Sequence, residues 1–99
     1  MAIRWSHEAL EQLSEIRSFI AKDSPERAEK FVSQIIGHAE AALVNQPHIG
    51  RIVPEIYNPS IRELIFKGYR IIYTSTPKSI RIITVFEGRR LLRINEIAL

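Results

Sequence analysis

Two β-rich runs meet at a tight turn within Arg62-Glu63-Leu64-Ile65-Phe66-Lys67-Gly68-Tyr69-Arg70-Ile71-Ile72-Tyr73. The turn is Lys67-Gly68, because a glycine there can adopt the positive φ that a two-residue hairpin loop requires. Side chains alternate between the faces of a strand. In the first strand, Arg62, Leu64 and Phe66 should therefore share one face and Ile61, Glu63 and Ile65 the other. In the second strand, Tyr69, Ile71 and Tyr73 should separate from Arg70 and Ile72. Both faces are partly apolar, so we expect this β-hairpin to lie inside a sheet.

Two further strands are expected. Residues 79–86 form a β-rich run after Pro77, and proline both ends a strand and favours a turn, which predicts a three-stranded antiparallel meander. Residues 2–5 alternate between apolar and polar and suit an edge strand. Tyr69 and Tyr73 share a face, where they could stack nucleic-acid bases, but packing beneath helices is the favoured interpretation.

Two amphipathic helices separate the first strand from the meander. Ser6 can cap a helix that runs to about Ala21, with apolar residues at helical spacing: Leu10, Leu13, Ile16 and Ile20. Ser24-Pro25 starts a second helix to about Val44, with the apolar stripe Ala28, Phe31, Val32, Ile35, Ala39 and Leu43. The short connection makes the helices antiparallel neighbours that can cover one face of a sheet. The expected fold is α+β, in the order β-α-α-β-β-β, with a helical hairpin on a small antiparallel sheet.

The remaining segments are less regular. Residues 45–60 contain prolines and a glycine and are expected to be the least structured part, and residues 91–99 form an apolar-rich tail of ambiguous conformation. The 99 residues suit one domain, spanning residues 1–99. No signal-peptide run or membrane-length apolar window is present, and cysteine is absent, so a soluble cytoplasmic protein without membrane contact is expected.

The sequence offers few groups for metal or cofactor chemistry. His7, His38 and His48 stand at no recognised metal spacing and are interpreted as surface or loop residues. No phosphate-binding glycine loop and no serine elbow is present, which leaves nucleotide hydrolysis and α/β-hydrolase chemistry without support. We expect neither a metal nor a cofactor.

Charge is distributed unevenly along the chain. Residues 1–50 carry a net charge of −2 and residues 51–99 a net charge of +5, and the second half uses arginine far more than lysine. Guanidinium groups bind phosphate and carboxylate in a bidentate manner, so these arginines could bind RNA or an acidic peptide. Structural ion pairs, for example with Glu63, are the alternative. The candidate anion-binding or target-binding residues are Arg51, Arg62, Arg70, Arg81, Arg89, Arg90 and Arg93.

The order of elements and several short motifs resemble the ParE/RelE superfamily of type II toxins over nearly the whole chain. The motifs are Arg4-Trp5-Ser6, Asp23-Ser24-Pro25, Pro47…Gly50-Arg51, Pro54-Glu55, Ile61-Arg62-Glu63-Leu64, Tyr69-Arg70-Ile71-Ile72-Tyr73 and Gly88-Arg89-Arg90. The resemblance implies a small growth-inhibiting toxin, paired with an antitoxin encoded in the adjacent reading frame, that reaches operator DNA only through that antitoxin.

Two branches of this superfamily differ in mechanism. RelE-like members cleave mRNA on the ribosome, and the resemblance would then give catalytic roles to Glu55, Arg62 and Glu87. ParE-like members inhibit DNA gyrase and lack that catalytic set. The Gly88-Arg89-Arg90 ending resembles the ParE branch, although Glu87 replaces the histidine that commonly precedes it there. We favour the ParE-like mechanism, so the chain is an enzyme only under the RelE-like alternative. A degenerate member that binds antitoxin without toxicity is the third possibility.

The antitoxin itself should be small. A basic second half and an apolar tail favour a partner with an acidic, partly disordered segment that folds on binding. We expect this segment to cross the sheet and to contact Arg89, Arg90 and residues 91–99.

Overall fold

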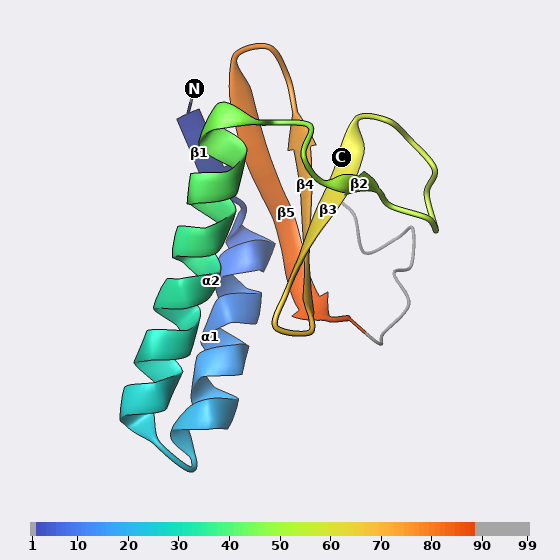
Figure 1. Ribbon diagram of the computed structural model, residues 1–99. Coiled ribbons are helices and arrows are strands. Elements are labelled where there is room, and N and C mark those ends of the chain that lie inside the picture. Colours follow the sequence, from blue (N-terminus) through green and yellow to red (C-terminus); the bar gives the residue numbers. More distant parts are fainter. Residues whose placement is uncertain (1, 89–99) are drawn as a thin grey trace.

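Two antiparallel helices cover one face of a five-stranded sheet in the computed structural model, which describes residues 2–88 (Figure 1). The strands are β1 (Ala2–Trp5), β2 (Arg51–Ile52), β3 (Ile61–Phe66), β4 (Tyr69–Ser75) and β5 (Ser79–Glu87), in the spatial order β1-β5-β4-β3-β2. The helices are α1 (His7–Ala21) and α2 (Pro25–Asn45). The predicted α+β class and the helical hairpin on one face are confirmed.

Both helices begin at the residues that the sequence indicated. The hydroxyl of Ser6 accepts a hydrogen bond from the Ala9 N–H, and the hydroxyl of Ser24 accepts one from the Arg27 N–H, with Pro25 in the first helical position. Ser6 also donates its hydroxyl proton to the carbonyl of Ile83 at 2.6 Å. A single N-cap therefore fixes α1 to β5 as well as starting the helix.

The central hairpin has the predicted register and turn. Lys67 and Gly68 both have positive φ, 49° and 84°, as a type I′ turn requires. The face towards the helices carries Leu64, Phe66, Tyr69, Ile71 and Tyr73, which pack with α1 and α2 in the main core. The other face, called the open face below, carries a second cluster: Val53, Ile61, Ile72, Ile83 and Phe86, with Ile56 packed against it. The expected packing of the tyrosines beneath the helices is confirmed.

One strand pairing differs from a purely antiparallel sheet. β1 is an edge strand, as expected, but it runs parallel to β5, so the sheet is mixed. The reason is connectivity: the antiparallel helical hairpin lies between β1 and the meander, and β5 is the last strand of that meander. A bulge in β5 opposite Ile72 and Tyr73 turns Ile83 to the open face.

The segment 45–60 is more ordered than predicted. Arg51 and Ile52 form the short strand β2 against Glu63 and Arg62 of β3, and Val53 is fully buried. The polar, loop-like composition of this segment does not indicate the edge strand, because its pairing partners on β3 are ten and twelve residues further along the chain. The apolar tail, residues 91–99, lies outside the described residues.

Not every residue of the predicted helical stripes is in the core. Leu10 is 51% exposed, which corrects its assignment to the buried face of α1, where Ala9 and Leu13 are buried instead. On α2, Ile35 is fully buried, whereas Phe31 is only partly buried and meets the ring of Tyr69 edge-on. The predicted surface positions of His7, His38 and His48 are confirmed, and His38 stacks on Phe66 with ring centroids 4.4 Å apart.

Candidate functional site

A four-residue ionic network lies on the open face of the sheet. Arg70 is at its centre and is only 4% exposed. Its Nε donates to Glu63 at 2.6 Å, while Nη1 and Nη2 donate to the two carboxylate oxygens of Glu55 at 2.7 and 2.8 Å. Arg51 donates from Nε to the second oxygen of Glu63. The network thus binds β2, β3, β4 and the 53–60 loop together.

Strand register explains how the network forms. Glu63 pairs directly with Ile72, and Ile65 pairs with Arg70, so Glu63 and Arg70 are diagonal neighbours on one face. Arg51 stands directly opposite Glu63 on β2. The guanidinium of Arg70 also lies over the ring of Phe86, 5.2 Å from its centroid. The carboxylates and the ring together leave this arginine ordered and desolvated.

The electrostatics of the network favour the charged form of Arg70. The hydrogen bonds that Arg70 donates to Glu55 raise the pKa of Arg70 further above its usual value; burial opposes this effect and Glu63 reinforces it. Two arginines and two glutamates make the network formally neutral. A neutral network of this kind joins elements of the fold and offers little net charge to a polyanion.

The other candidate residues are dispersed. Arg62 donates from Nη1 to the carbonyl of Gly50 at 2.9 Å and from Nε to that of Pro59 at 3.1 Å, so it fastens the ends of the 51–60 segment. Arg81 is exposed on β5. Arg89, Arg90 and Arg93 lie outside the described residues.

The two candidate acid and base groups, Glu55 and Glu87, lie on opposite faces of the sheet. Glu87 pairs with Tyr69, whose ring faces the helices, and it borders a hollow beside Ile16 and Phe19 of α1. Glu55 belongs to the network on the open face. The structure therefore does not bring the two carboxylates together at one site.

Gly50 makes a close contact that the sequence motif indicates without explaining. Its N–H donates to the hydroxyl of the fully buried Tyr73 at 2.9 Å, and a Cβ at this position would approach the Glu63 carbonyl oxygen to 2.6 Å. Burial raises the pKa of the Tyr73 hydroxyl, and the hydrogen bond from Gly50 and the charge of Arg62 lower it in part. Gly50 is therefore required where β2 begins.

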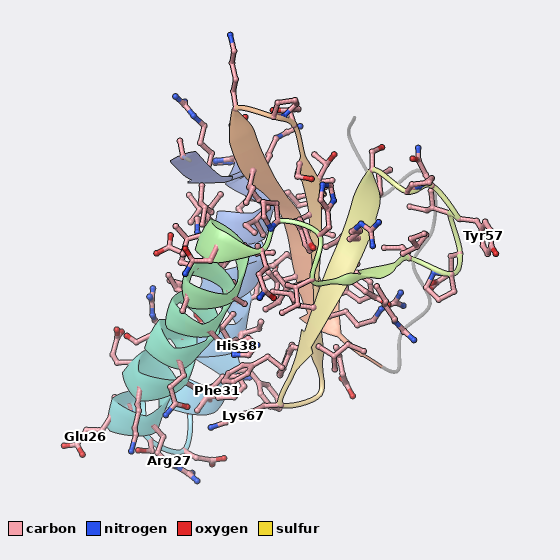
Figure 2. The ribbon with its side chains drawn as sticks, turned by 45° about the horizontal axis from the view of Figure 1, so that its top comes forward. Glu26, Arg27, Phe31, His38, Tyr57 and Lys67 are labelled. Carbon is pink, nitrogen blue, oxygen red and sulfur yellow. The ribbon has the colours of Figure 1, made fainter. Side chains whose placement is uncertain are left out.

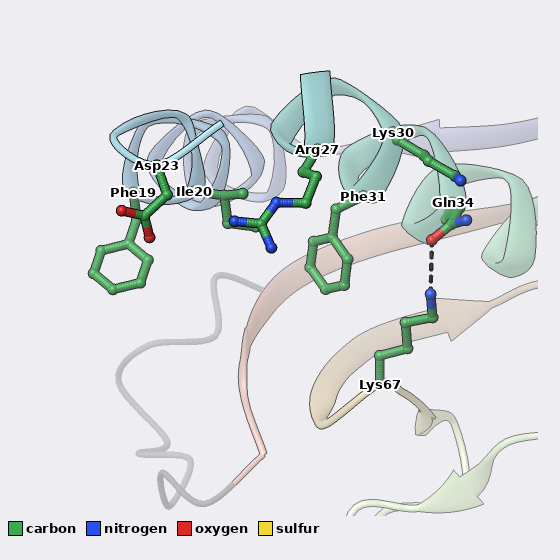
Figure 3. Close-up of a pocket in the computed structure, with 8 residues that line it drawn as sticks. All are labelled: Phe19, Ile20, Asp23, Arg27, Lys30, Phe31, Gln34 and Lys67. Atoms are coloured by element: carbon green, nitrogen blue, oxygen red, sulfur yellow. Dashed lines mark hydrogen bonds between the residues drawn. The ribbon is translucent and has the colours of Figure 1, made fainter. Parts of the chain in front are cut away.

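A second candidate surface is a groove at the far end of the helical hairpin, called the basic groove below. Figure 2 shows Phe31 and Lys67 side by side where α2 meets the β3–β4 turn. The cavity there has a volume of about 530 Å³ and is lined by Phe19, Ile20, Asp23, Arg27, Lys30, Phe31, Gln34 and Lys67 (Figure 3). A neighbouring hollow of about 300 Å³ shares Phe19 with the basic groove and is lined also by Tyr69 and Phe86.

The basic groove combines apolar walls with three cations. Lys67 is oriented by its hydrogen bond to Gln34 at 2.8 Å (Figure 3). Arg27 and Lys30 make no side-chain hydrogen bond or ion pair within residues 2–88. Phe19, on the groove wall, is 70% exposed. An apolar surface with unpaired cations around it suits an acidic amphipathic segment.

Sequence reasoning missed this groove. Its residues come from three separate segments, and Phe19 lies outside the apolar stripe of α1. The available signals were that unassigned aromatic and the cations Arg27 and Lys30 in the first turns of α2. For the network, Glu63 was recognised as a possible ion-pair partner, and that alternative is confirmed for Arg51 and Arg70.

The described part of the chain holds neither a cluster of metal-ligating side chains nor a membrane-spanning helix. Within residues 2–88, His, Cys, Asp and Glu form no group of three that could hold a metal ion. Among the helices of the same part of the chain, neither is long and apolar enough to cross a membrane.

An α-hairpin on a mixed sheet, with a buried ionic network and a basic groove, defines a small α+β domain. The sequence model of the family described as "ParE toxin of type II toxin-antitoxin system, parDE" matches residues 3–92, and the chain belongs to this family.

Two similar proteins extend this comparison. A Sinorhizobium fredii protein with the printed name "Putative toxin Y4kP" is 45% identical over 49 residues, which is half of each chain, so the match spans about half the length of that relative. A solved structure described as "Chromosomal ParDE TA system from P. aeruginosa" superimposes with a TM-score of 0.71 at 22% identity, covering 88% of this chain and 95% of the other. At that identity, the likeness establishes the shared fold.

Proposed function

We propose that this toxin acts in the cytoplasm by inhibiting DNA gyrase. The support is the ParE family match together with the pairing of Glu55 with Arg70. The RelE-like alternative needs a free base for the 2′-hydroxyl and an acid for the leaving oxygen. Both oxygens of Glu55 are instead engaged by one guanidinium, and Glu87 belongs to the other face of the sheet. This geometry favours an inhibitor that binds its target over a ribonuclease.

The mechanism is tested with two assays on the purified protein. We expect inhibition of gyrase-catalysed supercoiling and no cuts in the mRNA of programmed ribosomes. Cleavage of mRNA in the ribosomal A site, abolished by Glu55→Ala or Arg62→Ala, would establish the RelE-like alternative. Loss of a general base lowers a rate by about 100- to 10,000-fold. Induced expression in cells provides the third comparison. Normal growth in the presence of folded protein would identify a degenerate, non-toxic member.

The proposed partner is an antitoxin from the adjacent reading frame, docked in the basic groove. Charge complementarity supports this location, since Arg27, Lys30 and Lys67 surround an apolar wall and only Asp23 opposes them among the lining residues. An acidic amphipathic segment would place apolar side chains against Phe19 and Phe31 and its carboxylates against the cations. This site differs from the expected path over Arg89, Arg90 and residues 91–99, which lie outside the described residues.

Charge reversal tests the antitoxin site. The substitution Lys30→Glu should weaken antitoxin binding about 10-fold or more at low salt, and the loss should shrink as salt rises. Lys78→Glu, on the exposed β4–β5 turn, is the matched control and should change affinity less than about two-fold. Equal effects of both changes would mean that the contribution is only that of net charge.

A further inference from the structure

Tyr57 combines an exposed aromatic ring with an unfavourable backbone conformation. Its side chain is 83% exposed and its φ is +56°, in the left-handed region. Lys67 is the other non-glycine residue with positive φ in residues 2–88, and the type I′ turn with Gly68 accounts for it. The position of Tyr57 gives no comparable reason for an aromatic residue.

The local geometry at Tyr57 would suit glycine. The N–H of Ile56 donates to the carbonyl of Val53 at 3.2 Å, and that of Tyr57 donates to the same carbonyl at 2.8 Å. This is one helical turn that ends in a left-handed residue, a position that glycine or asparagine usually occupies. A tyrosine there lowers the stability of the fold, because its Cβ is crowded against the backbone.

No contact in the described part of the chain offsets that cost. The side chain of Tyr57 makes neither a hydrogen bond nor a ring contact within residues 2–88. In Figure 2 it projects from the loop, well away from Arg27, Phe31 and Lys67 of the basic groove. Residues held in strained backbone conformations of this kind cluster at active sites and binding sites.

The loop that displays Tyr57 is held on both sides. Before it, Val53 is fully buried, Ile56 packs on the open-face cluster and Glu55 is bonded to Arg70. After it, Asn58 accepts hydrogen bonds from Ser60 and Ile61. Two more hydrogen bonds hold the loop: Arg62 donates to the Pro59 carbonyl, and Thr74 donates to the Ser60 carbonyl. An ordered loop presents its aromatic residue at a small entropic cost on binding.

We propose that Tyr57 is the anchor through which the toxin engages its protein target, an inference that rests on the proposed function. Tyrosine is enriched at binding hot spots because its rigid ring fills apolar pockets while its hydroxyl keeps a hydrogen bond. The complementary target surface is an apolar pocket with a hydrogen-bond acceptor in its wall.

Substitution by glycine tests this inference sharply, because it removes the ring and relieves the strain together. Tyr57→Gly should unfold at an equal or higher denaturant concentration than the wild type and should bind antitoxin with unchanged affinity. Its inhibition of gyrase should fall about 30-fold or more, the effect of losing a hot-spot side chain. Tyr57→Phe separates the two parts of the anchor and should retain the ring's share of the inhibition.

The control is Ile49→Ala, which truncates another exposed apolar side chain in a neighbouring loop and should change inhibition less than about two-fold. Undiminished inhibition by Tyr57→Gly would overturn the inference, and so would lower stability or weaker antitoxin binding. If wild-type protein leaves gyrase active, the proposed function fails by itself. Growth arrest on induction then tests the anchor separately: a toxic wild type with a folded, non-toxic Tyr57→Gly supports it, and equal toxicity refutes it.

Discussion

Glu63 and Arg70 form a buried, diagonal cross-strand ion pair, with Arg70 Nε 2.6 Å from the Glu63 carboxylate. The Glu63 side chain is completely inaccessible, so its charge has been taken out of water and depends on its partners. A buried pair contributes modestly to stability as a pair, but removal of one member leaves an uncompensated charge. The network therefore holds β2, β3, β4 and the 53–60 loop in one specific arrangement on the open face.

The first prediction concerns this ionic network. Arg70→Met should destabilise the protein by about 3–5 kcal/mol, because both Glu55 and Glu63 lose their main partner. Arg51→Met removes a half-exposed member and should cost about 1 kcal/mol or less. Urea denaturation measures both values. Similar losses for the two variants would show that burial of Arg70 contributes no additional stability.

The second prediction concerns the α2 stripe. Ile35→Ala should cost about 2–5 kcal/mol, since Ile35 is fully buried and its truncation leaves a cavity. Phe31→Ala should cost less than the same substitution in a fully buried site, because Phe31 keeps one edge in the basic groove. Phe19→Ala, at a 70% exposed position, is the control and should stay within about 0.5 kcal/mol of wild type. An unchanged melting temperature for Ile35→Ala would contradict the assigned core.

Features set by neighbouring residues could be predicted from the sequence, and features set by distant ones could not. The caps at Ser6 and Ser24 and the turn at Lys67-Gly68 depend on residues within one turn of chain, and each was predicted correctly. The parallel pairing of β1 with β5 joins segments more than 70 residues apart, and no local pattern specifies its direction.

The same distinction applies to the candidate sites. Alternation predicted which residues of each strand share a face, but the contact of Glu63 with Arg70 depends on strand register, and the recruitment of Glu55 depends on how the 53–60 loop folds back. The basic groove needs the tip of the helical hairpin to meet the β3–β4 turn, which only the packed structure defines. The strain at Tyr57 is a backbone property without a composition signal, since glycine would be the expected residue there.

The third prediction is a matched pair of glycine substitutions. Gly50→Ala should destabilise the protein by about 1–3 kcal/mol, because its Cβ would lie 2.6 Å from the Glu63 carbonyl oxygen and 2.7 Å from the Tyr73 hydroxyl. Gly37→Ala places the same methyl group inside α2, where nothing lies within 4 Å. It should stabilise the helix by about 0.5–1 kcal/mol. Thermal unfolding should thus move in opposite directions, and a shared direction would contradict the packing at Gly50.

The fourth prediction concerns alkaline stability. Burial raises the pKa of Tyr73 above its usual value of 10.0, so the folded state favours the neutral phenol. The resulting stabilisation is complete below the unfolded pKa and is lost as the pH rises through the folded pKa. Between about pH 8 and about pH 10.5, the wild type should therefore lose more unfolding free energy than Tyr73→Phe, which has no phenol to ionise at this position.

Tyr73→Phe should also carry a cost that does not depend on pH. The buried N–H of Gly50 loses its acceptor, which should lower the unfolding free energy by about 1–3 kcal/mol at neutral pH. The measurement is chemical denaturation of both proteins at each pH, and the pH-dependent part is the difference between the two slopes. Parallel pH profiles for wild type and Tyr73→Phe would mean that Tyr73 ionises with the same pKa in the folded and unfolded chains. That result would contradict the raised pKa of the buried Tyr73 hydroxyl.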